Sequence, residues 1–406
     1  MIPFLTEENL KWKELAREVA EKVVRPLAAK YDQLQEYPWE VKDAMAEAGL
    51  LGVWIPKEYG GHGAGVLDLC LVTEELSKAC GGIGVAFAVN ALGSFPIILS
   101  GTEEQKKHYL PQIAKGEKLI AFGLSEKFAG SDAGSLRTRA EKSAGGWIIN
   151  GEKKWTTNGG IAEIYSVFAV TDPESQRARI SAFIVEKDDP GFSITKIEDK
   201  MGIRAVPVVE LDFENCEVPE DRLLGGKTGQ GFKQAMMTLD RARPGVAGQG
   251  VGLAQGALDY AAVYANRRQQ FGKSIGSFQM IQGMLADMSA RVEAARYLVY
   301  AAAKNIDNGA SNISALAAQA KLFATDTAMS VTTDAVQIFG GYGYMKDYPV
   351  EKFMRDAKIT QIYEGTNQVQ RMVTARHVLK GARDLKHLEE FIPNEVQKDV
   401  DLGTED

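Results

Sequence analysis

Apolar side chains recur at helical spacing through the first third of the chain. Between residues 6 and 120 they fall four or five positions apart with charges between them, for example at Leu10, Leu15, Val19, Val23 and Leu27. Thr6 stands at a candidate N-cap, and Thr102 with Gln105 has the Thr-x-x-Gln form of a capping box. This third is therefore predicted to be helical.

The pattern changes near residue 119, where short β-rich runs replace the helical periodicity. Turn signals such as Gly145-Gly146 and Asn150-Gly151 separate these runs. The runs lie at Leu119–Leu124, Trp147–Asn150, Ile164–Thr171, Ile180–Glu186 and Val208–Phe213. Strands spaced in this way predict a small barrel or sandwich.

Helical periodicity returns near residue 231 and continues almost to the end of the chain. The stretch 246–305 is rich in helix formers, and a second run, Ile313–Phe339, ends at a glycine-rich segment. Long helices of this kind pack as a bundle. The predicted fold is α+β, with a helical domain at 1–120, a β-domain at 121–230, a helical bundle at 231–385 and a polar, frayed tail at 386–406.

Composition and charge narrow the class of protein. The chain has 406 residues, of which 45% are hydrophobic and 25% charged, so it can form two or three globular domains. Its formal net charge of -7 argues against a nucleic-acid partner. Three cysteines without a Cys-x-x-Cys pair and four histidines without a metal-ligand spacing argue against a disulfide framework and a metal site.

The N-terminal segment gives no sign of targeting. It has neither the basic stretch nor the apolar run of a secretory leader. We see no run of about 18 apolar residues that would span a membrane. We therefore expect a cytoplasmic protein, although a mature enzyme of the mitochondrial matrix would have the same features.

Two segments approach known motifs but fail their requirements. A P-loop at Gly225-Gly226-Lys227-Thr228 would need glycine where Asp221 stands, and no Gly-x-Gly-x-x-Gly fingerprint joins a strand to a helix. Ser131 lacks the Gly-x-Ser-x-Gly elbow and an evident His and Asp partner, which disfavours a serine hydrolase. The small residues around Ser131 instead suit close approach of a ligand to the backbone.

The segment around Glu364 carries the most specific candidate chemistry. Glu364 precedes Gly365, and Thr366 and Gln368 add hydrogen-bonding side chains within one turn. Removal of a proton next to a carbonyl needs a carboxylate base and a donor, such as a backbone N–H, for the developing enolate. The alternative is a surface glutamate before a glycine that breaks a helix.

Two further segments suit a flat cofactor with phosphates. The run Trp155-Thr156-Thr157-Asn158-Gly159 combines an indole with hydroxyls and glycine, and its alternative is a strand end with a core tryptophan. The run Arg268-Gln269-Gln270-Phe271-Gly272 supplies an arginine suited to bidentate phosphate contact beside an aromatic ring. Its alternative is a solvated arginine at a helix end.

In order and spacing, these segments resemble those of the acyl-CoA dehydrogenases over roughly residues 1–385. That family consists of flavoproteins with an N-terminal helical domain, a central β-domain and a C-terminal four-helix bundle. The matching segments are Phe122-Gly123-Leu124-Ser125-Glu126, Ala129-Gly130-Ser131-Asp132, Trp155-Thr156-Thr157-Asn158-Gly159, Asp240-Arg241-Ala242-Arg243, Arg268-x-x-Phe271-Gly272, Gln337-Ile338-Phe339-Gly340-Gly341 and Tyr363-Glu364-Gly365-Thr366.

The resemblance implies FAD-dependent α,β-dehydrogenation of an acyl-CoA thioester to the trans-2-enoyl-CoA. Glu364 would take the α-proton, the Gly365 N–H and a ribityl hydroxyl would hold the thioester carbonyl, and flavin N5 would accept the β-hydride. Some relatives place the base near Asp240, but the intact Glu364 segment favours the C-terminal position. Electrons would pass to an electron-transfer flavoprotein, and the family is usually a homotetramer, a dimer of dimers.

The resemblance also assigns binding roles to residues elsewhere. The isoalloxazine ring would lie against Phe122, Leu124, Ser125, Trp155 and Thr157. The adenine end of FAD would reach Thr366 and Gln368. A neighbouring subunit would supply Arg268, Gln270, Phe271, Gln337 and Gly341. The acyl-CoA would contact Ser131, Asp240, Arg243 and Tyr363, with Asp240 either a CoA contact or a structural residue.

The chain departs from the family pattern near the substrate entrance. Lys127 and Phe128 replace a proline and a small residue of the family's loop. We expect them to favour an unusual acyl group: branched, alicyclic, aromatic or dicarboxylic, for example of the benzylsuccinyl type. Asn90, polar within an apolar run, is a further candidate for the acyl pocket, with a core hydrogen bond as the alternative. The absence of arginine between Lys78 and Lys106 disfavours coupled decarboxylation.

Two other functions stay open on the same fold. A flavin acyl-CoA oxidase or monooxygenase would use oxygen directly, but such oxidases usually carry an extra C-terminal domain and such monooxygenases usually lack a base at the position of Glu364. The third function is a non-catalytic acyl-CoA-binding protein. The intact segment Tyr363-Glu364-Gly365-Thr366 disfavours it.

Overall fold

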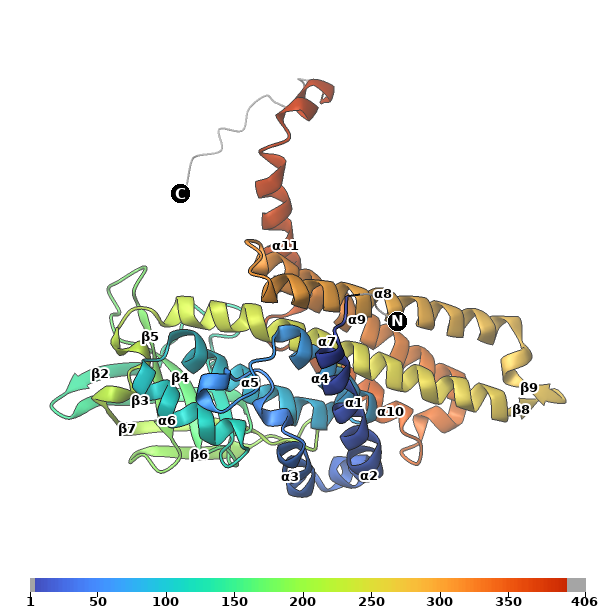
Figure 1. The fold of residues 1–406 in the computed structure, drawn as a ribbon, viewed down its shortest axis with the longest axis horizontal. Coiled ribbons are helices and arrows are strands. Elements are labelled where there is room, and N and C mark those ends of the chain that lie inside the picture. The colour runs from blue at the N-terminus through green and yellow to red at the C-terminus, as the bar shows by residue number, and fades with distance from the viewer. Residues whose placement is uncertain (1–3, 393–406) are drawn as a thin grey trace.

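The first third of the chain is helical, as the sequence predicts. The computed structural model describes residues 4–392, and Figure 1 shows a β-domain at one end and long helices extending to the other. Capping boxes of Thr6 with Asn9 and of Thr102 with Gln105 begin two of the helices, which confirms both predicted N-caps. The elements are α1 (Glu7–Val19), a π-helical segment (Ala20–Val24), α2 (Arg25–Leu34), α3 (Trp39–Glu47), α4 (Val66–Ala79), α5 (Gly81–Ser100) and α6 (Glu103–Ala114).

Helix α5 is an apolar helix of the core. It has no charged residue and is long and apolar enough to cross a membrane by composition alone, which corrects the expectation that no such run exists. However, 78% of its apolar window is buried inside the protein. Because α5 packs on α4, on α7 (Gly231–Arg267) and on strand β1 (Ile120–Gly123), it is a core helix enclosed by protein.

The middle of the described chain forms a seven-stranded sheet in the order β1-β4-β2-β3-β7-β6, with β5 also paired to β4. Strand β4 is parallel to β1 and to β2, and the other pairs are antiparallel. Large apolar side chains of β3, β4, β5 and β7 form a core of their own. The strands after β1 are β2 (Arg139–Ser143), β3 (Gly146–Thr157), β4 (Ile164–Val170), β5 (Ile180–Glu186), β6 (Phe192–Ile197) and β7 (Val208–Pro219).

Three features of this sheet differ from the prediction. The sequence pattern does not reveal β2 and β6, because β2 buries only Ala140 and every side chain of β6 is at least partly exposed. Strand β3 is longer than the predicted run 147–150, because it continues past two irregularities in its pairing with β7. Trp155 and Thr157 therefore belong to a strand.

The C-terminal third is a bundle built on the 37-residue helix α7. Helix α7 approaches α4 closely because Gly252 has no side chain: a Cβ there would lie 2.3 Å from the carbonyl oxygen of Glu74. The chain then forms a hairpin of β8 (Gln269–Gln270) and β9 (Lys273–Ser274), followed by α8 (Gln279–Asp307), α9 (Ile313–Phe339), α10 (Val350–Thr360) and α11 (Asn367–Ala382). Helix α9 has the bounds that the sequence predicts.

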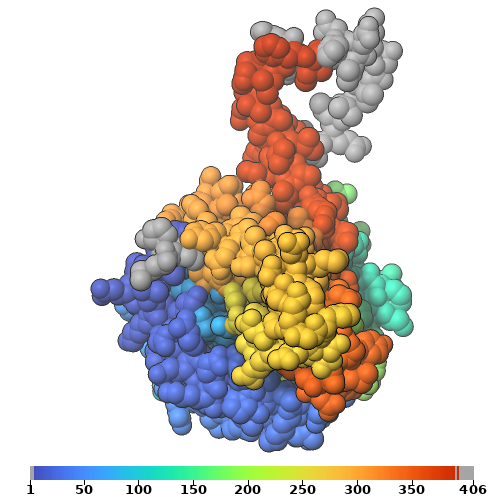
Figure 2. Space-filling model, turned by 90° about the vertical axis from the view of Figure 1, so that its right-hand side faces the viewer, coloured from blue at the N-terminus to red at the C-terminus, as the bar shows by residue number. Residues whose placement is uncertain are grey.

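The last helical segments stand out from the body of the molecule. Figures 1 and 2 show the end of α11 and the 3-10 helix Lys386–Phe391 projecting away from the bundle; we call residues 371–391 the C-terminal arm. The tail predicted as polar and frayed is thus helical up to residue 391, and its residues 393–406 lie outside the described part of the chain. The arm exposes the apolar side chains of Met372, Val378, Leu379, Leu388 and Phe391.

Candidate active site

Glu364 lies in the tight turn that joins α10 to α11. The hydroxyl of Thr366 caps α11 by accepting the Val369 N–H at 3.3 Å. Glu364 and Gly365 both have left-handed backbone conformations, with φ of 53° and 90°. Glycine adopts this region readily, whereas a glutamate there is strained, and such strain gathers at functional sites.

Side chains from three helices hold the backbone of this turn. Arg243 of α7 donates from Nε to the carbonyl oxygen of Glu364 at 3.0 Å. Lys321 of α9 donates from Nζ to the carbonyl oxygen of Gly365 at 2.9 Å. Gln370 of α11 donates from Nε2 to the same Gly365 oxygen at 2.8 Å. Because both carbonyl groups are held, the turn is fixed in one conformation.

The Glu364 side chain is half-buried, and one of its carboxyl oxygens is shielded. Its Oε2 atom is shielded from solvent and makes no hydrogen bond within residues 4–392. Burial raises the pKa of Glu364 to about 7, although the nearby cations of Arg243 and Lys321 act in the opposite direction. A carboxylate whose pKa lies close to neutrality is suited to general-base catalysis.

The turn sits where the bundle meets the β-domain. Tyr363 packs against the β-domain core, and its hydroxyl hydrogen-bonds to Gln249 of α7. Across the described chain, the backbone N–H of Gly365 takes part in no hydrogen bond. A carboxylate and an available backbone donor thus lie side by side at a domain junction.

The predicted flavin contacts of the β-domain gather at neighbouring strand ends. The Lys154 N–H donates to the Ser125 carbonyl oxygen at 2.9 Å, which places the loop after β1 beside Trp155 of β3. Trp155 is 59% exposed, so its indole is open to a flat ligand. The other predicted contacts on these strand ends are partly buried: Phe122, Leu124 and Thr157.

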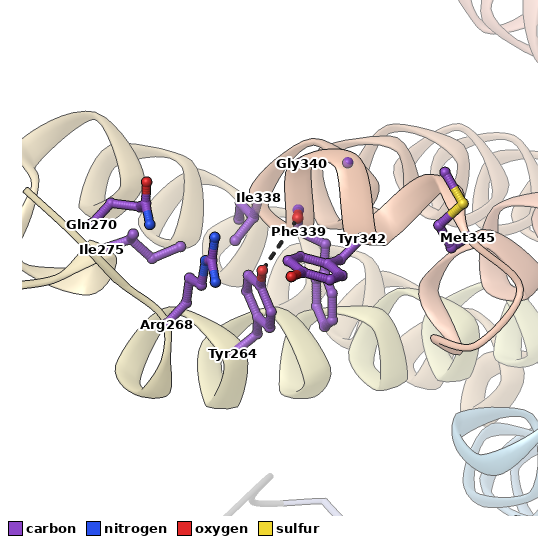
Figure 3. A pocket seen from close by; sticks show the side chains of 10 residues that line it. Tyr264, Arg268, Gln270, Ile275, Ile338, Phe339, Gly340, Tyr342 and Met345 are labelled. Atoms are coloured by element: carbon purple, nitrogen blue, oxygen red, sulfur yellow. Dashed lines mark hydrogen bonds between the residues drawn. The ribbon is translucent and has the colours of Figure 1, made fainter.

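A second group of predicted residues lies at the end of the bundle remote from the β-domain, near the β8–β9 hairpin (Figure 1). Arg268, Gln270 and Gly341 line an open hollow of about 510 Å³ (Figure 3). The guanidinium of Arg268 lies 5.2 Å from the ring centroid of Tyr342. Phe271 in the hairpin and Gln337 on α9 are exposed. The chain therefore does not bring this group together with Glu364.

The predicted acyl-CoA contacts are only partly assembled. Asp240 pairs with Arg243 at 3.2 Å and also accepts a hydrogen bond from the Ser314 hydroxyl. Asp240 therefore supports the arginine that holds the turn containing Glu364. Ser131 is exposed in the loop between β1 and β2. Gln368 is exposed on the first turn of α11.

The loop with Lys127 and Phe128 presents an aromatic ring between two cations. Phe128 is 63% exposed. The Arg137 guanidinium carbon lies 4.6 Å from the centroid of its ring, and Lys127 Nζ lies 5.4 Å from it. Both distances are typical of cation–π contacts. A cationic, aromatic surface thus projects from the β-domain at this loop.

Asn90 is a structural residue, which corrects its assignment to the acyl pocket. Its side chain is 1% exposed, donates to the Ala86 carbonyl oxygen at 2.8 Å and accepts the Ile120 N–H at 3.2 Å. These bonds tie α5 to β1. A buried amide with such partners is satisfied within the core.

Lys321 of α9 contacts the turn that contains Glu364, and sequence reasoning missed it. It is fully buried, and burial lowers its pKa to about 7. Besides Gly365, its Nζ donates to the side-chain oxygen of Asn367 at 2.9 Å. A signal was present, since Lys321 is the single Lys or Arg between residues 313 and 339 and stands among alanines on a buried helix.

Three family models match the chain in succession. The N-terminal, middle and C-terminal domains of acyl-CoA dehydrogenase match residues 6–117, 121–216 and 229–379. The chain belongs to the acyl-CoA dehydrogenase family. Over 376 residues this acyl-CoA dehydrogenase is 50% identical to a probable acyl-CoA dehydrogenase of Mycobacterium leprae, covering 93% of this chain and 96% of the relative.

Similarity to solved structures supports the same family assignment. The acyl-CoA dehydrogenase is similar to butyryl-CoA dehydrogenase from Megasphaera elsdenii, with a TM-score of 0.90 and 46% identity over 93% of this chain and 100% of that one. It is also similar to a chain in a structure described as the electron transferring flavoprotein of Acidaminococcus fermentans, with a TM-score of 0.91 and 51% identity over the same shares. The protein is thus an FAD-dependent oxidoreductase that acts on acyl-CoA.

The β-domain strand ends of this acyl-CoA dehydrogenase fit the isoalloxazine ring of FAD. The exposed indole of Trp155 offers a flat apolar face. Thr157, two positions further along β3 and so on the same face of the strand, is partly buried and adds a hydroxyl next to the indole. A flat ring system with polar edges matches this combination of surfaces.

Proposed function

We propose that this acyl-CoA dehydrogenase converts an acyl-CoA to the trans-2-enoyl-CoA with Glu364 as the catalytic base. The observation that carries the proposal is the shielded, unpartnered Oε2 atom of Glu364 next to the Gly365 N–H. The carboxylate removes a proton from Cα, the Cα–H electron pair forms the double bond, and the hydride leaves from Cβ. FAD, when bound, supplies the acceptor for that hydride.

Gly365 contributes the donor for the thioester carbonyl. A preorganised backbone N–H stabilises negative charge that develops on the carbonyl oxygen, and one such donor is worth about 3 kcal/mol. The carboxylate of Glu364 and the N–H of Gly365 belong to consecutive residues, both with left-handed backbone conformations. Because Glu364 Oε2 is shielded from solvent, its electrostatic interactions are stronger than they would be in water.

The acyl group is the finer part of the proposal. Similarity to a butyryl-CoA dehydrogenase supports a short acyl chain. The exposed Phe128 between Lys127 and Arg137 supports a bulkier or charged group: branched, alicyclic, aromatic or dicarboxylic. We propose the second class, because this loop departs from the family pattern.

Electron transfer and assembly complete the proposal. Similarity to a chain in the electron-transferring-flavoprotein structure supports an electron-transfer flavoprotein as the oxidant. The separation of Glu364 from the Arg268 hollow supports a second copy of the chain that supplies Arg268, Gln270, Phe271, Gln337 and Gly341 to each FAD. The exposed apolar side chains of the C-terminal arm support further association into a homotetramer. A cytoplasmic location stays a prediction.

The test is an anaerobic titration with a panel of acyl-CoAs while the flavin absorbance is recorded. We expect one class to bleach the wild-type flavin, and Glu364→Gln to slow that bleaching by roughly 10²- to 10⁴-fold while FAD stays bound. Glu214→Gln, at an exposed glutamate of β7, is the matched control and should behave as wild type.

The same titration separates the other functions on this fold. A yellow protein that no acyl-CoA bleaches would contradict the proposal and indicate a redox-silent binding protein. Bleached enzyme that is reoxidised faster by oxygen than by an electron-transfer flavoprotein would identify an oxidase. Undiminished bleaching of Glu364→Gln would exclude Glu364 as the base.

A further inference from the structure

We propose that Lys321 is a positioning residue for Glu364: it fixes the left-handed turn through the Gly365 carbonyl, and its charge stabilises the ionised carboxylate. The inference rests on the proposed role of Glu364 as the base. No family pattern used above assigns a role to this lysine. Lys321 lies on α9, which packs on α7 and on α10 and α11, the two helices that the turn joins.

Lys321 is held by hydrogen bonds to the turn and the start of α11, not by a direct ion pair. Its Nζ donates at 2.9 Å to the Gly365 carbonyl oxygen and at 2.9 Å to Asn367 Oδ1. Among the described residues, no carboxylate oxygen lies within 4.0 Å of Nζ. Burying an unpaired cation is costly, so the interactions that retain it are those with the turn and with the charges around it.

Asn367 links the lysine to the start of α11. Its Oδ1 accepts from Lys321, and its Nδ2 donates to Thr325 Oγ1 at 2.9 Å and to Asp326 Oδ1 at 2.7 Å. Lys321, Thr325 and Asp326 all belong to α9. The first residue of α11 and the carbonyl that precedes it are therefore held by one face of α9.

Charged groups from three helices lie around this site. Helix α7 contributes Arg243 and its partner Asp240, α9 contributes Asp326 beside Lys321, and α11 contributes Arg371, which pairs with Asp326 at 2.8 Å. Arg243 and Lys321 both oppose the rise in the pKa of Glu364 that burial causes. Removing the lysine charge leaves Arg243 alone in that role, so the pKa of Glu364 must rise further.

A neighbouring tyrosine does not compete for this proton at neutral pH. Tyr363 faces Glu364 and Asp356 of α10, and burial raises the pKa of its hydroxyl well above the usual range. It therefore stays protonated while Glu364 and Lys321 titrate. The pair that changes charge near neutrality is Glu364 with Lys321.

The experiment compares three substitutions that separate charge from hydrogen bonding. Lys321→Arg keeps the charge and N–H donors, Lys321→Gln keeps a donor without charge, and Lys321→Met keeps neither. The primary measurement is the infrared band of the protonated Glu364 carboxyl group against pH in substrate-free enzyme. The band is identified by its loss in Glu364→Gln, so it does not depend on catalysis.

We expect the Glu364 midpoint to move up by about one pH unit in Lys321→Gln and Lys321→Met, tenfold in acidity, and to stay near wild type in Lys321→Arg. The pH profile of flavin bleaching should move with it, and Lys321→Met should also lose rate on the high-pH plateau. If Lys321→Met fails to fold, the Arg and Gln variants still differ in charge while each keeps an N–H donor.

Equal midpoints in Lys321→Arg and Lys321→Gln would overturn the inference. This outcome is distinct from failure of the proposed function, in which wild-type flavin is not bleached by any acyl-CoA. A midpoint shift in a protein that no acyl-CoA bleaches would keep the Lys321–Glu364 coupling and reject the reaction.

Discussion

At the scale of single residues, Glu364 combines two unfavourable features in one position. Its left-handed backbone costs on the order of 1–3 kcal/mol for a residue other than glycine. Its Oε2 atom is buried and makes no hydrogen bond in the described chain. The hydrogen bonds from Arg243, Lys321 and Gln370 to the adjacent carbonyls keep the residue in place despite both costs.

The raised pKa of Glu364 has a consequence for stability. An acid whose pKa is higher in the folded than in the unfolded protein binds more protons when folded, so its contribution to stability falls as pH rises from about 4.5 to above 7. Glu364→Gln removes this loss. We expect the variant to unfold at a higher temperature than wild type at pH 8, with a smaller difference at pH 5, by calorimetry of substrate-free protein. A constant difference at both pH values would contradict the raised pKa.

At the scale of elements, the loop between β1 and β2 has one part held by buried hydrogen bonds and another part exposed to solvent. Glu126 accepts Lys153 Nζ at 2.6 Å and the backbone N–H groups of Arg137 and Thr138 at 2.6 and 3.1 Å. Burial lowers the pKa of Lys153 to about 8 against the pull of Glu126. The next two residues, Lys127 and Phe128, project from this anchor into solvent.

The residues that anchor the loop are distinct from the exposed residues Lys127 and Phe128. Substitutions of Lys127 and Phe128 should therefore alter substrate specificity without altering the fold. We expect Lys127→Ala and Phe128→Gly to change the ratio of kcat/KM between straight short-chain and cyclic or dicarboxylic acyl-CoAs by about tenfold, with the unfolding temperature unchanged. An unchanged ratio would mean that this loop does not select the acyl group. Lys142→Ala, at an exposed lysine of β2, is the control.

The elements also show where sequence reasoning succeeds. Strong helical periodicity predicts α9 to the residue, and the Thr102 capping box predicts the start of α6. The sequence pattern does not predict strands β2 and β6, because their exposed, polar residues show no alternation of hydrophobic and polar positions. Motif spacing finds Glu364, but it cannot find Lys321, because that contact joins α9 to a turn 44 positions later in the chain.

At the scale of the whole molecule, the predicted cofactor contacts fall into two separate groups, one of them at the end of the bundle remote from the β-domain (Figure 1). One group surrounds Glu364 and the strand ends of the β-domain, and the other surrounds the hollow lined by Arg268 and Gly341 (Figure 3). We propose that no single FAD touches both groups of one chain. Each complete site would therefore need two chains.

Mixing two inactive variants tests this arrangement. Arg268→Glu should lose FAD, and Glu364→Gln should lose flavin bleaching, each when pure. A mixed dimer contains one site with both native residues, so co-refolding equal amounts should restore about a quarter of the wild-type activity for random pairing of two-site dimers. Arg267→Glu, at the exposed neighbouring arginine, should retain FAD and activity by itself.

An absence of recovery in the mixture, with each variant folded by circular dichroism, would place the whole site within one chain. Recovery that also occurs when either variant is refolded alone would show that the substitution is not inactivating. The intermediate result expected here requires that the two halves come from different chains.

The proposed sharing of each FAD site by two chains would also govern how the holoenzyme forms. A site shared by two chains is absent from a fully folded monomer, so uptake of flavin must follow an encounter between chains. Reconstitution of the apoprotein should then be second order in protein, slowing in proportion to dilution even when free FAD is in large excess. In a cell, the amount of FAD-loaded enzyme would depend on how much of the chain is synthesised as well as on the supply of FAD.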